Sequence, residues 1–137
     1  MSAAGERIAA RARGLVGTRF RPQGRDPAHG LDCVGTAAAA AGIPPERIRR
    51  DYPMRGQGTG DIEHALCDLG CRPVTLETSE AGDLIVCEAG AAQLHLVVST
   101  GAGFVHADAG LRRVAERPFP LPWRVLSVWR LVDREDE

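Results

Sequence analysis

Lysine is absent from this chain of 137 residues, so all 17 basic residues are arginine. Alongside the abundant alanine and glycine, this bias indicates a GC-rich genome rather than selection for phosphate binding. An excess of charge is absent as well, because the net charge is only −1. No overall field therefore directs the chain toward nucleic acid or an anionic membrane, and neither is expected as a partner.

A long apolar run is missing from the first 12 residues, where Glu6, Arg7 and Arg11 interrupt the sequence. A secretory signal or a membrane span needs such a run, so neither is predicted and synthesis in the cytoplasm is expected. The four cysteines are expected to be free thiols in that reducing compartment. The length of 137 residues predicts a single domain over residues 1–137.

What the chain does contain is a series of helical patterns. Apolar residues at helical spacing over residues 8–16 predict a first helix that Gly17 ends. Glycine and proline make residues 18–30 a shaped loop. A helix of small side chains is then predicted over Cys33–Ala41, and Gly42 ends it. Small side chains let neighbouring elements approach closely, so this helix is expected to be central and buried.

The second half of the chain predicts a short helix and then strands. Asp61 is the predicted N-cap of a helix over residues 62–69, which Gly70 ends. The β-branched segments that follow are short and bounded by turns. These predicted strands cover residues 74–76, 83–87, 93–99, 103–106, 111–116 and 125–132. Helices first and an antiparallel sheet second predict the α+β class.

Cys33 stands where the small-residue helix begins, directly after Asp32. A thiol on the first turn of a helix meets oriented backbone N–H groups and the positive end of the helix dipole, and both favour the thiolate. The thiolate is the nucleophilic form of cysteine. The sequence therefore predicts a nucleophile at Cys33.

His95 and His106 lie on two consecutive, otherwise apolar strands. If these strands form a hairpin across residues 100–102, the imidazoles lie close together on one face, and the helix bearing Cys33 packs against that face. A thiol, an imidazole and a polar group that orients the imidazole are the groups that nucleophilic catalysis by cysteine uses. The alternative interpretation is that each histidine is a core or edge residue without a chemical role.

Other candidate sites are weaker. His64, Cys67 and Cys71 could imitate a zinc-ligand set, but they lack the paired Cys-x-x-Cys spacing of structural zinc sites. No metal or other cofactor is predicted, and the cysteines are interpreted as structural. Trp123 and Trp129 are expected to pack on the sheet rather than to stack on sugars.

Five segments of the chain resemble the NlpC/P60 family, papain-like cysteine peptidases that cut the stem peptides of peptidoglycan. Residues 17–24 (GTRFRPQG) and 30–35 (GLDCVG) are similar to the block around the nucleophile. Residues 81–85 (AGDLI) are similar to the family's Pro-Gly-Asp strand, 95–98 (HLVV) to the strand of the base, and 105–107 (VHA) to the strand of the third polar residue. The resemblance spans nearly the whole chain.

The resemblance implies a role for each matched residue. Cys33 corresponds to the nucleophile, His95 to the general base and then acid, and His106 to the group that orients His95. Asp32 corresponds to a residue near the amino group of the substrate, and Phe20 stands where many relatives have a tyrosine. The implied fold is α+β and papain-like, with the nucleophile helix packed on an antiparallel sheet.

Three departures from the family pattern indicate a changed substrate groove: Phe20 has no hydroxyl, residues 22–23 (PQ) replace Trp-Gly, and Val34 replaces serine. Two functions of different class follow. One is a peptidase acting on peptidoglycan stem peptides, and the other is a non-catalytic structural or wall-binding component that keeps the fold. Another thiol-dependent acyl transfer is a third alternative.

Within the family, the chain most resembles the phage-type branch of tail modules and gene-transfer particles. The similar segments are residues 21–24 (RPQG), 104–108 (FVHAD), 114–116 (VAE), 123–124 (WR) and 128–130 (VWR). The resemblance implies phage-like tail or particle proteins as partners and delivery of the protein to the cell wall by such a particle.

Overall fold

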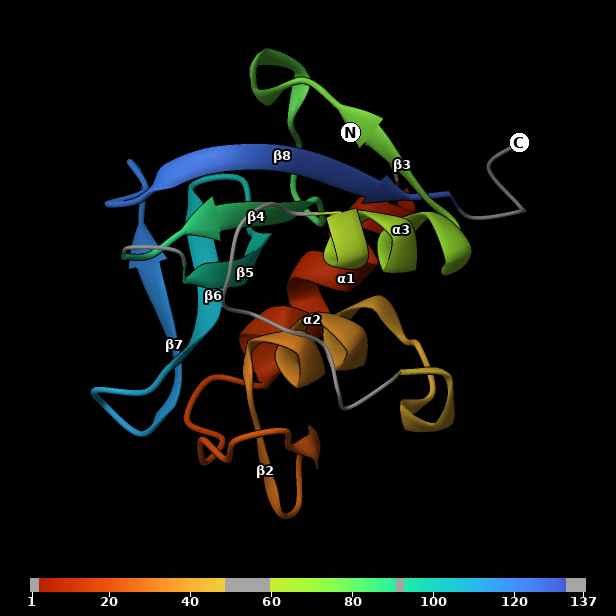
Figure 1. Ribbon diagram of the computed structural model, residues 1–137. Helices are drawn as coiled ribbons and strands as arrows, with labels where there is room; N and C mark the ends of the chain where they lie inside the picture. The colour runs from red at the N-terminus through yellow and green to blue at the C-terminus, as the bar shows by residue number, and fades with distance from the viewer. Residues whose placement is uncertain (1–2, 49–59, 91–92, 133–137) are drawn as a thin grey trace.

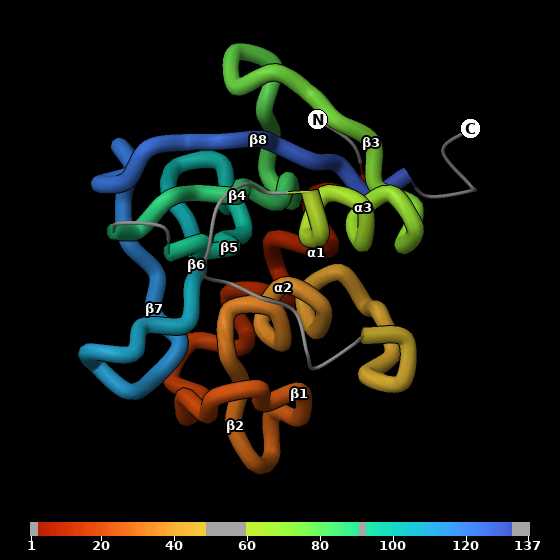
Figure 2. Tube along the Cα trace, viewed as in Figure 1, coloured from red at the N-terminus to blue at the C-terminus, as the bar shows by residue number. Residues whose placement is uncertain are grey.

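The computed structural model describes residues 3–48, 60–90 and 93–132. Within these ranges, three α-helices lie on one side of a six-stranded antiparallel sheet, and a two-stranded ribbon lies beside the second helix (Figures 1 and 2). This arrangement confirms the predicted α+β class.

The helices and strands have the following bounds. The helices are α1 (Ala3–Gly14), α2 (Cys33–Ala41) and α3 (Gly60–Asp68), with single 3-10 turns at Pro45–Arg47 and Leu76–Thr78. The strands are β1 (Arg25–Asp26), β2 (Gly30–Leu31), β3 (Cys71–Val74), β4 (Leu84–Glu88), β5 (Leu94–Ser99), β6 (Gly103–Asp108), β7 (Arg113–Pro118) and β8 (Arg124–Leu131).

The six strands follow the order β3-β8-β4-β5-β6-β7, and every pair is antiparallel. β5 and β6 are joined across residues 100–102, which confirms the predicted hairpin. Their paired residues are Val98 opposite Val105 and Ser99 opposite Phe104. Beyond Val98 and Val105 the two strands no longer pair, so the sheet opens at the end that carries the histidines.

Apolar side chains sort to the two faces of the sheet by strand alternation. The face under the helices, called the helix face here, carries Leu96, Val98 and Val105, which pack with residues of α1, α2 and α3. The opposite face, called the outer face, carries Val97 and Phe104. Both faces of the central strands are therefore covered.

The small side chains of α2 allow the close approach that the sequence predicts. Ala37 and Ala40 are 3% and 0% exposed. A Cβ on Gly35 would clash with the carbonyl oxygen of Gly24, so no larger residue fits there without moving the preceding loop. Close packing thus ties α2 to the loop and ribbon before it.

The predicted ends of the first helix and the loop after it are partly wrong. α1 covers Ala3–Gly14 rather than residues 8–16, since the chain leaves the helix through single turns at its carboxyl end. The predicted loop at residues 18–30 contains β1 and the start of β2. Backbone bonds to distant segments shape it, such as Phe20 N–H to the carbonyl of Arg112 at 3.0 Å.

Two further predictions need correction. α3 begins at Gly60, so Asp61 lies inside its first turn instead of capping it. The predicted strand at residues 74–76 is wrong, because β3 ends at Val74. Thr75 then caps a 3-10 turn, accepting a hydrogen bond from the backbone N–H of Thr78 at 3.3 Å.

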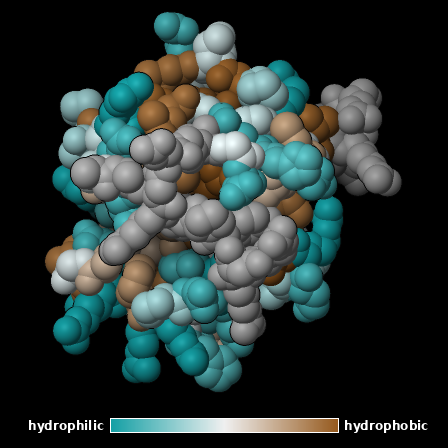
Figure 3. Space-filling view, in the orientation of Figure 1, coloured by the Kyte–Doolittle hydropathy of each residue, from teal (hydrophilic) through white to brown (hydrophobic). Residues whose placement is uncertain are grey.

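The described surface is mixed in polarity. Figure 3 shows hydrophilic groups over much of one face, with smaller hydrophobic patches between them. None of the helices in the described ranges is long and apolar enough to cross a membrane.

Candidate active site

Asp32 defines the start of α2. Its Oδ1 accepts hydrogen bonds from the backbone N–H of Gly35 at 2.8 Å and from Nη1 of Arg25 at 2.7 Å. Its Oδ2 accepts from the backbone N–H of Gln23 at 3.1 Å. A side chain that accepts from the third residue of a helix is an N-cap. α2 therefore begins at Cys33, as predicted, and the cap ties the loop to the helix.

Arg25 is a partner of this site that sequence reasoning missed. Its side chain is 3% exposed, and it forms an ion pair with Asp32. A buried guanidinium requires such a counter-charge. The resemblance implies that Asp32 lies near the substrate's amino group, and Asp32 does line the cleft described below, but Arg25 already pairs with its charge. Nothing in the sequence distinguishes Arg25 from Arg19 and Arg21 of the same loop.

One cleft of about 570 Å³ collects all of the predicted site residues. Cys33 and Asp32 reach it from the start of α2, and Phe20 from the loop before the helix. His95 reaches it from β5 and His106 from β6. The structure thus brings together residues that are far apart in the sequence, and their catalytic roles stay predictions.

The histidines reach the cleft from the outer face of the sheet. His95 and His106 are close together, which confirms that part of the prediction. The prediction that α2 packs against the sheet face carrying the histidines is wrong. α2 packs against the helix face instead, through residues such as Leu96. Strand alternation puts His95 on the other side from Leu96. Cys33 shares a cleft with the imidazoles at the end of the sheet where β5 and β6 have diverged.

The two imidazoles form a hydrogen-bonded pair beneath an indole. Nε2 of His95 lies 2.9 Å from Nδ1 of His106. The ring of Trp123 meets both edge-on, with centroid distances of 4.9 Å to His95 and 5.3 Å to His106. Because Nε2 of His95 is engaged with His106, Nδ1 is the ring nitrogen of His95 that this pair leaves available.

Burial raises the pKa of the Cys33 thiol to about 11. The charge of Asp32 raises this pKa as well, whereas hydrogen bonds from the backbone N–H groups of Leu96 and Val34 lower it. Of the groups at the helix start, the N–H of Val34 acts in the predicted direction and Asp32 acts against it, and desolvation outweighs both. The pKa of Cys33 is therefore shifted in the direction opposite to the predicted one, which favours the neutral thiol at neutral pH.

Burial also lowers the pKa of His95 to about 4. The neighbouring His106 lowers it further, and Asp108 raises it. His95 is thus unprotonated at neutral pH and able to accept a proton. The cleft therefore holds a neutral thiol at Cys33 beside a neutral imidazole at His95.

Alkylation of Cys33 by iodoacetamide is expected to accelerate about tenfold per pH unit from about pH 6 to about pH 9, because only the thiolate reacts. The exposed Cys67 is the internal reference and is expected to react first at neutral pH. Peptide mass mapping measures both rates in one sample. A rate at Cys33 that is already constant near pH 6 would show a resident thiolate instead.

Trp123 is a second residue whose place in the site the sequence did not indicate. Its predicted packing on the sheet is confirmed by its contact with Phe104, at a centroid distance of 5.7 Å. Its contacts with the two imidazoles go beyond that prediction. No spacing or motif pairs a tryptophan just before β8 with histidines on β5 and β6, so only the fold reveals the contact.

The substitution Trp123→Ala is expected to admit water to His95. Since burial is the main cause of the low pKa of His95, this pKa should rise from about 4 toward the ordinary value of 6.5. Titration of the imidazole by NMR measures the change. Trp129→Phe alters an indole in the core of the helix face and should leave the titration as it is. An unchanged pKa in Trp123→Ala would contradict the shielding role.

The weaker zinc candidates do not converge. Cys67 is exposed on α3, Cys71 is buried in β3, and His64 lies 3.4 Å from Asp68. In residues 3–48, 60–90 and 93–132, no group of three or more His, Cys, Asp or Glu side chains is placed to hold a metal ion.

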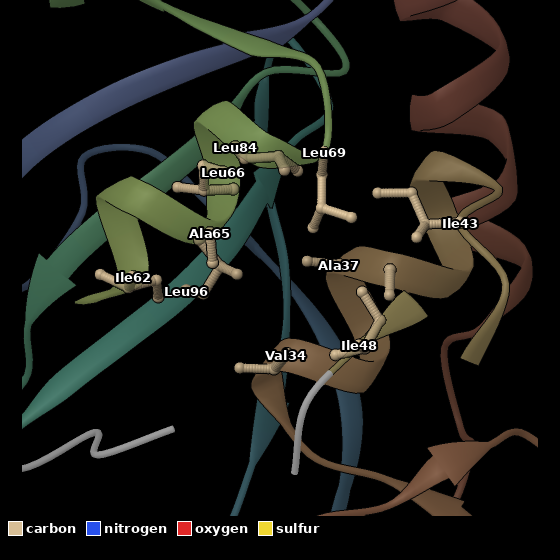
Figure 4. Close-up of a pocket in the computed structure, with 11 residues that line it drawn as sticks. Val34, Ala37, Ile43, Ile48, Ile62, Ala65, Leu66, Leu69, Leu84 and Leu96 are labelled. Carbon is tan, nitrogen blue, oxygen red and sulfur yellow. The ribbon is translucent and has the colours of Figure 1, made fainter. Parts of the chain in front are cut away.

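A second hollow, of about 30 Å³, lies on the helix face (Figure 4). Val34 of α2, Ile62 and Leu66 of α3, and Leu96 of β5 are among its lining residues, all of which are apolar in the described part of the chain. A binding site needs a few polar groups to orient its ligand. This hollow is therefore interpreted as a packing gap between the helices and the sheet.

The sequence matches no protein-family model, and no curated protein matches it. The fold, in contrast, is similar to several solved structures. NlpC1 from Trichomonas vaginalis is 20% identical, with a TM-score of 0.69 over 95% of this chain. The chain spans only 46% of that protein.

Two neighbours match over nearly their whole length. The NlpC/p60 domain of the peptidoglycan hydrolase SagA is 19% identical, with a TM-score of 0.63 over 93% of this chain and 98% of that domain. RipD from Mycobacterium tuberculosis, described as a non-catalytic NlpC/p60 domain protein adapted to peptidoglycan binding, is 14% identical. Its TM-score is 0.61 over 96% of this chain and 100% of RipD. At these identities the likeness establishes the architecture: this chain has the NlpC/P60 fold.

Proposed function

We propose that this protein is a cysteine peptidase that hydrolyses amide bonds in the stem peptides of peptidoglycan. The observation that carries the proposal is a single cleft holding Cys33, at a helix start, together with the hydrogen-bonded pair His95 and His106. An imidazole oriented by a second polar group is the base that a thiol nucleophile needs. The name of SagA as a peptidoglycan hydrolase supports this class of substrate.

The reaction follows from the arrangement of the three side chains. Nδ1 of His95 takes the thiol proton as Sγ of Cys33 bonds to the amide carbon. His95 then returns that proton to the amide nitrogen as the C–N bond breaks, which releases an amine and leaves a thioester. A water molecule, deprotonated by His95, attacks the thioester, so the acid leaves and the thiol is restored. His106 holds the ring of His95 throughout.

The tetrahedral intermediate needs hydrogen-bond donors for its oxyanion. The backbone N–H of Cys33, at the first residue of α2, is one candidate. Phe20 lines the cleft but carries no hydroxyl, so it contributes an apolar wall and no donor. The groove therefore differs from one that has tyrosine at this position.

Digestion of purified peptidoglycan tests the proposal. The protein is expected to release peptides that carry one new amino end and one new carboxyl end, and mass spectrometry identifies the bond that was cut. The variant His64→Ala changes an exposed histidine outside the cleft and should release the same peptides. A parent protein that releases no peptide from peptidoglycan would contradict the proposal.

A non-catalytic wall-binding role is the second candidate function. RipD, described as adapted to peptidoglycan binding, has the same fold. The neutral, desolvated thiol of Cys33 favours this candidate too, because a resident thiolate would be the stronger sign of an enzyme. Sedimentation of the protein with peptidoglycan, with no peptide released, is the result expected of a binding component.

Delivery by a phage-like particle, with tail or particle proteins as partners, is also part of the proposal. Its support is the similarity of residues 21–24 and 104–108 to phage-type members. The protein is expected among the proteins that mass spectrometry detects in particles purified from the producing cells. Particles that lack it would contradict this route.

A further inference from the structure

One ring nitrogen of His106 is buried without a hydrogen bond. Nδ1 is engaged with His95, but Nε2 has no hydrogen-bond partner among the described residues. The side chain is only 3% exposed, so solvent does not satisfy it. Oδ2 of Asp108 is 3.9 Å from Nε2, which is too long for a hydrogen bond. Buried polar atoms without a partner are rare and often mark a functional site.

Asp108 is held in place by its other oxygen. Oδ1 accepts a hydrogen bond from the backbone N–H of Leu111 at 3.0 Å, in the turn between β6 and β7. The side chain is 23% exposed and lines the cleft. Oδ2 remains the oxygen nearest to His106. A small movement of the carboxylate therefore completes a bond to Nε2 without disturbing the turn.

The charged groups around the two imidazoles act in opposite directions. The carboxylate of Asp108 raises the pKa of both histidines, although burial keeps both below the ordinary value. From β7, Arg117 lies over the ring of Trp123 and lowers the pKa of His106. Asp108 is thus the carboxylate whose charge acts on both imidazoles.

The proposed reaction allows only one arrangement of protons on the pair. His95 must have a bare Nδ1 to accept the proton of Cys33, so its own proton is on Nε2. Nε2 of His95 then donates to Nδ1 of His106, which must be bare. The proton of a neutral His106 is consequently on Nε2, the atom that faces Asp108.

We propose that Asp108 is a positioning residue that places the proton of His106 on Nε2 and thereby keeps Nδ1 of His95 free for Cys33. This inference rests on the proposed peptidase function for its catalytic meaning. Once the carboxylate closes the 3.9 Å gap, it accepts from Nε2–H of His106, and His106 in turn accepts from Nε2–H of His95. The outcome is a series of hydrogen bonds with one fixed direction, from the carboxylate through both imidazoles toward the thiol.

The variant Asp108→Asn is expected to reverse the direction of this series of hydrogen bonds. The amide oxygen keeps the bond from Leu111 N–H, so the amide NH₂ takes the place of Oδ2 and donates to Nε2 of His106. The proton of His106 moves to Nδ1, and that of His95 moves to its own Nδ1. Nitrogen chemical shifts from long-range ¹H–¹⁵N NMR spectra distinguish protonated from bare ring nitrogens and measure the exchange directly.

The ranking of two variants by activity separates this role from a structural one. Asp108→Asn should lower kcat by about 10²–10⁴-fold with KM little changed, because His95 is then in the wrong tautomer. Asp108→Ala removes the preference for a proton on Nε2 of His106 without adding a hydrogen-bond donor. It should therefore keep more activity than Asp108→Asn. A role confined to the turn predicts the reverse order, since only Asn keeps the bond to Leu111.

Glu116→Gln is the matched control. It removes the same charge from β7, where the carboxylate contacts Arg13 and Thr100 instead of the histidines, and it should change neither tautomers nor kcat. Unchanged tautomers in Asp108→Asn, or an alanine variant less active than the asparagine variant, would overturn the proposal. A parent protein that cuts no peptidoglycan would reject the peptidase function, while the NMR result would still decide the role of Asp108.

Discussion

Replacing Cys33 by alanine is expected to reduce the release of peptides from peptidoglycan by about 10⁴-fold or more. The thiol is the only atom group of the cleft that forms and breaks the proposed covalent bond to the acyl carbon. Binding contacts and the candidate oxyanion donor at the backbone of residue 33 remain in the variant. Product release measured by mass spectrometry gives the rate, and peptidoglycan sedimentation gives the binding.

The fold of Cys33→Ala should be intact. Alanine is a good helix former at the first position of α2, and the Asp32 cap does not involve the thiol. Cys67→Ala, which removes an exposed thiol on α3, is the matched control and should keep full activity. Hydrolysis at the parental rate in Cys33→Ala would mean that another group is the nucleophile. A thioester adduct on residue 33, trapped only in the parent, would identify the intermediate directly.

Asp32→Ala is expected to lower the free energy of unfolding by about 3–5 kcal/mol. The change removes the N-cap of α2 and the carboxylate 2.7 Å from the nearly buried Arg25. Breaking a buried ion pair by removing one partner is more destabilising than losing a cap alone. Urea unfolding followed by tryptophan fluorescence measures the difference.

Two variants divide this effect into its parts. Asp32→Ser keeps an oxygen that can cap α2 but leaves Arg25 without that carboxylate, so it should recover only about 1 kcal/mol. Asp26→Ala is the matched control, because its carboxylate contacts His29 and the backbone N–H of Ala28 at the surface, and the substitution should cost less than about 1 kcal/mol. Equal unfolding curves for Asp32→Ala and Asp26→Ala would contradict a structural role for the buried pair.

Local signals predicted the parts of the fold that depend on neighbours in sequence. Asp32 before a run of small residues and Gly42 after it define α2 correctly, because capping acts within one turn. The ribbon of β1 and β2 was not predicted. It depends on bonds such as Leu31 N–H to the carbonyl of Arg19, in a loop where glycine and proline mask any strand pattern.

The members of the candidate site were predictable, whereas its electrostatics were not. His95 and His106 lie on strands that follow each other directly across residues 100–102, so a hairpin brings them to the same end of two adjacent strands. The protonation state of Cys33 depends instead on how many atoms surround the thiol in three dimensions. The side of the sheet that each histidine occupies follows from strand register, which only the complete set of strand pairs defines.

The proposed nucleophile and its proposed base belong to different layers of the molecule. Cys33 is attached to a helix, while His95 and His106 are attached to a sheet, and the core of the helix face separates the two layers. Ala37, Ala40 and Leu96 therefore act as a spacer whose thickness sets the distance from sulfur to imidazole. A misplacement of about 1 Å can slow a reaction 10²-fold, so chemistry as well as stability limits the size of these buried side chains.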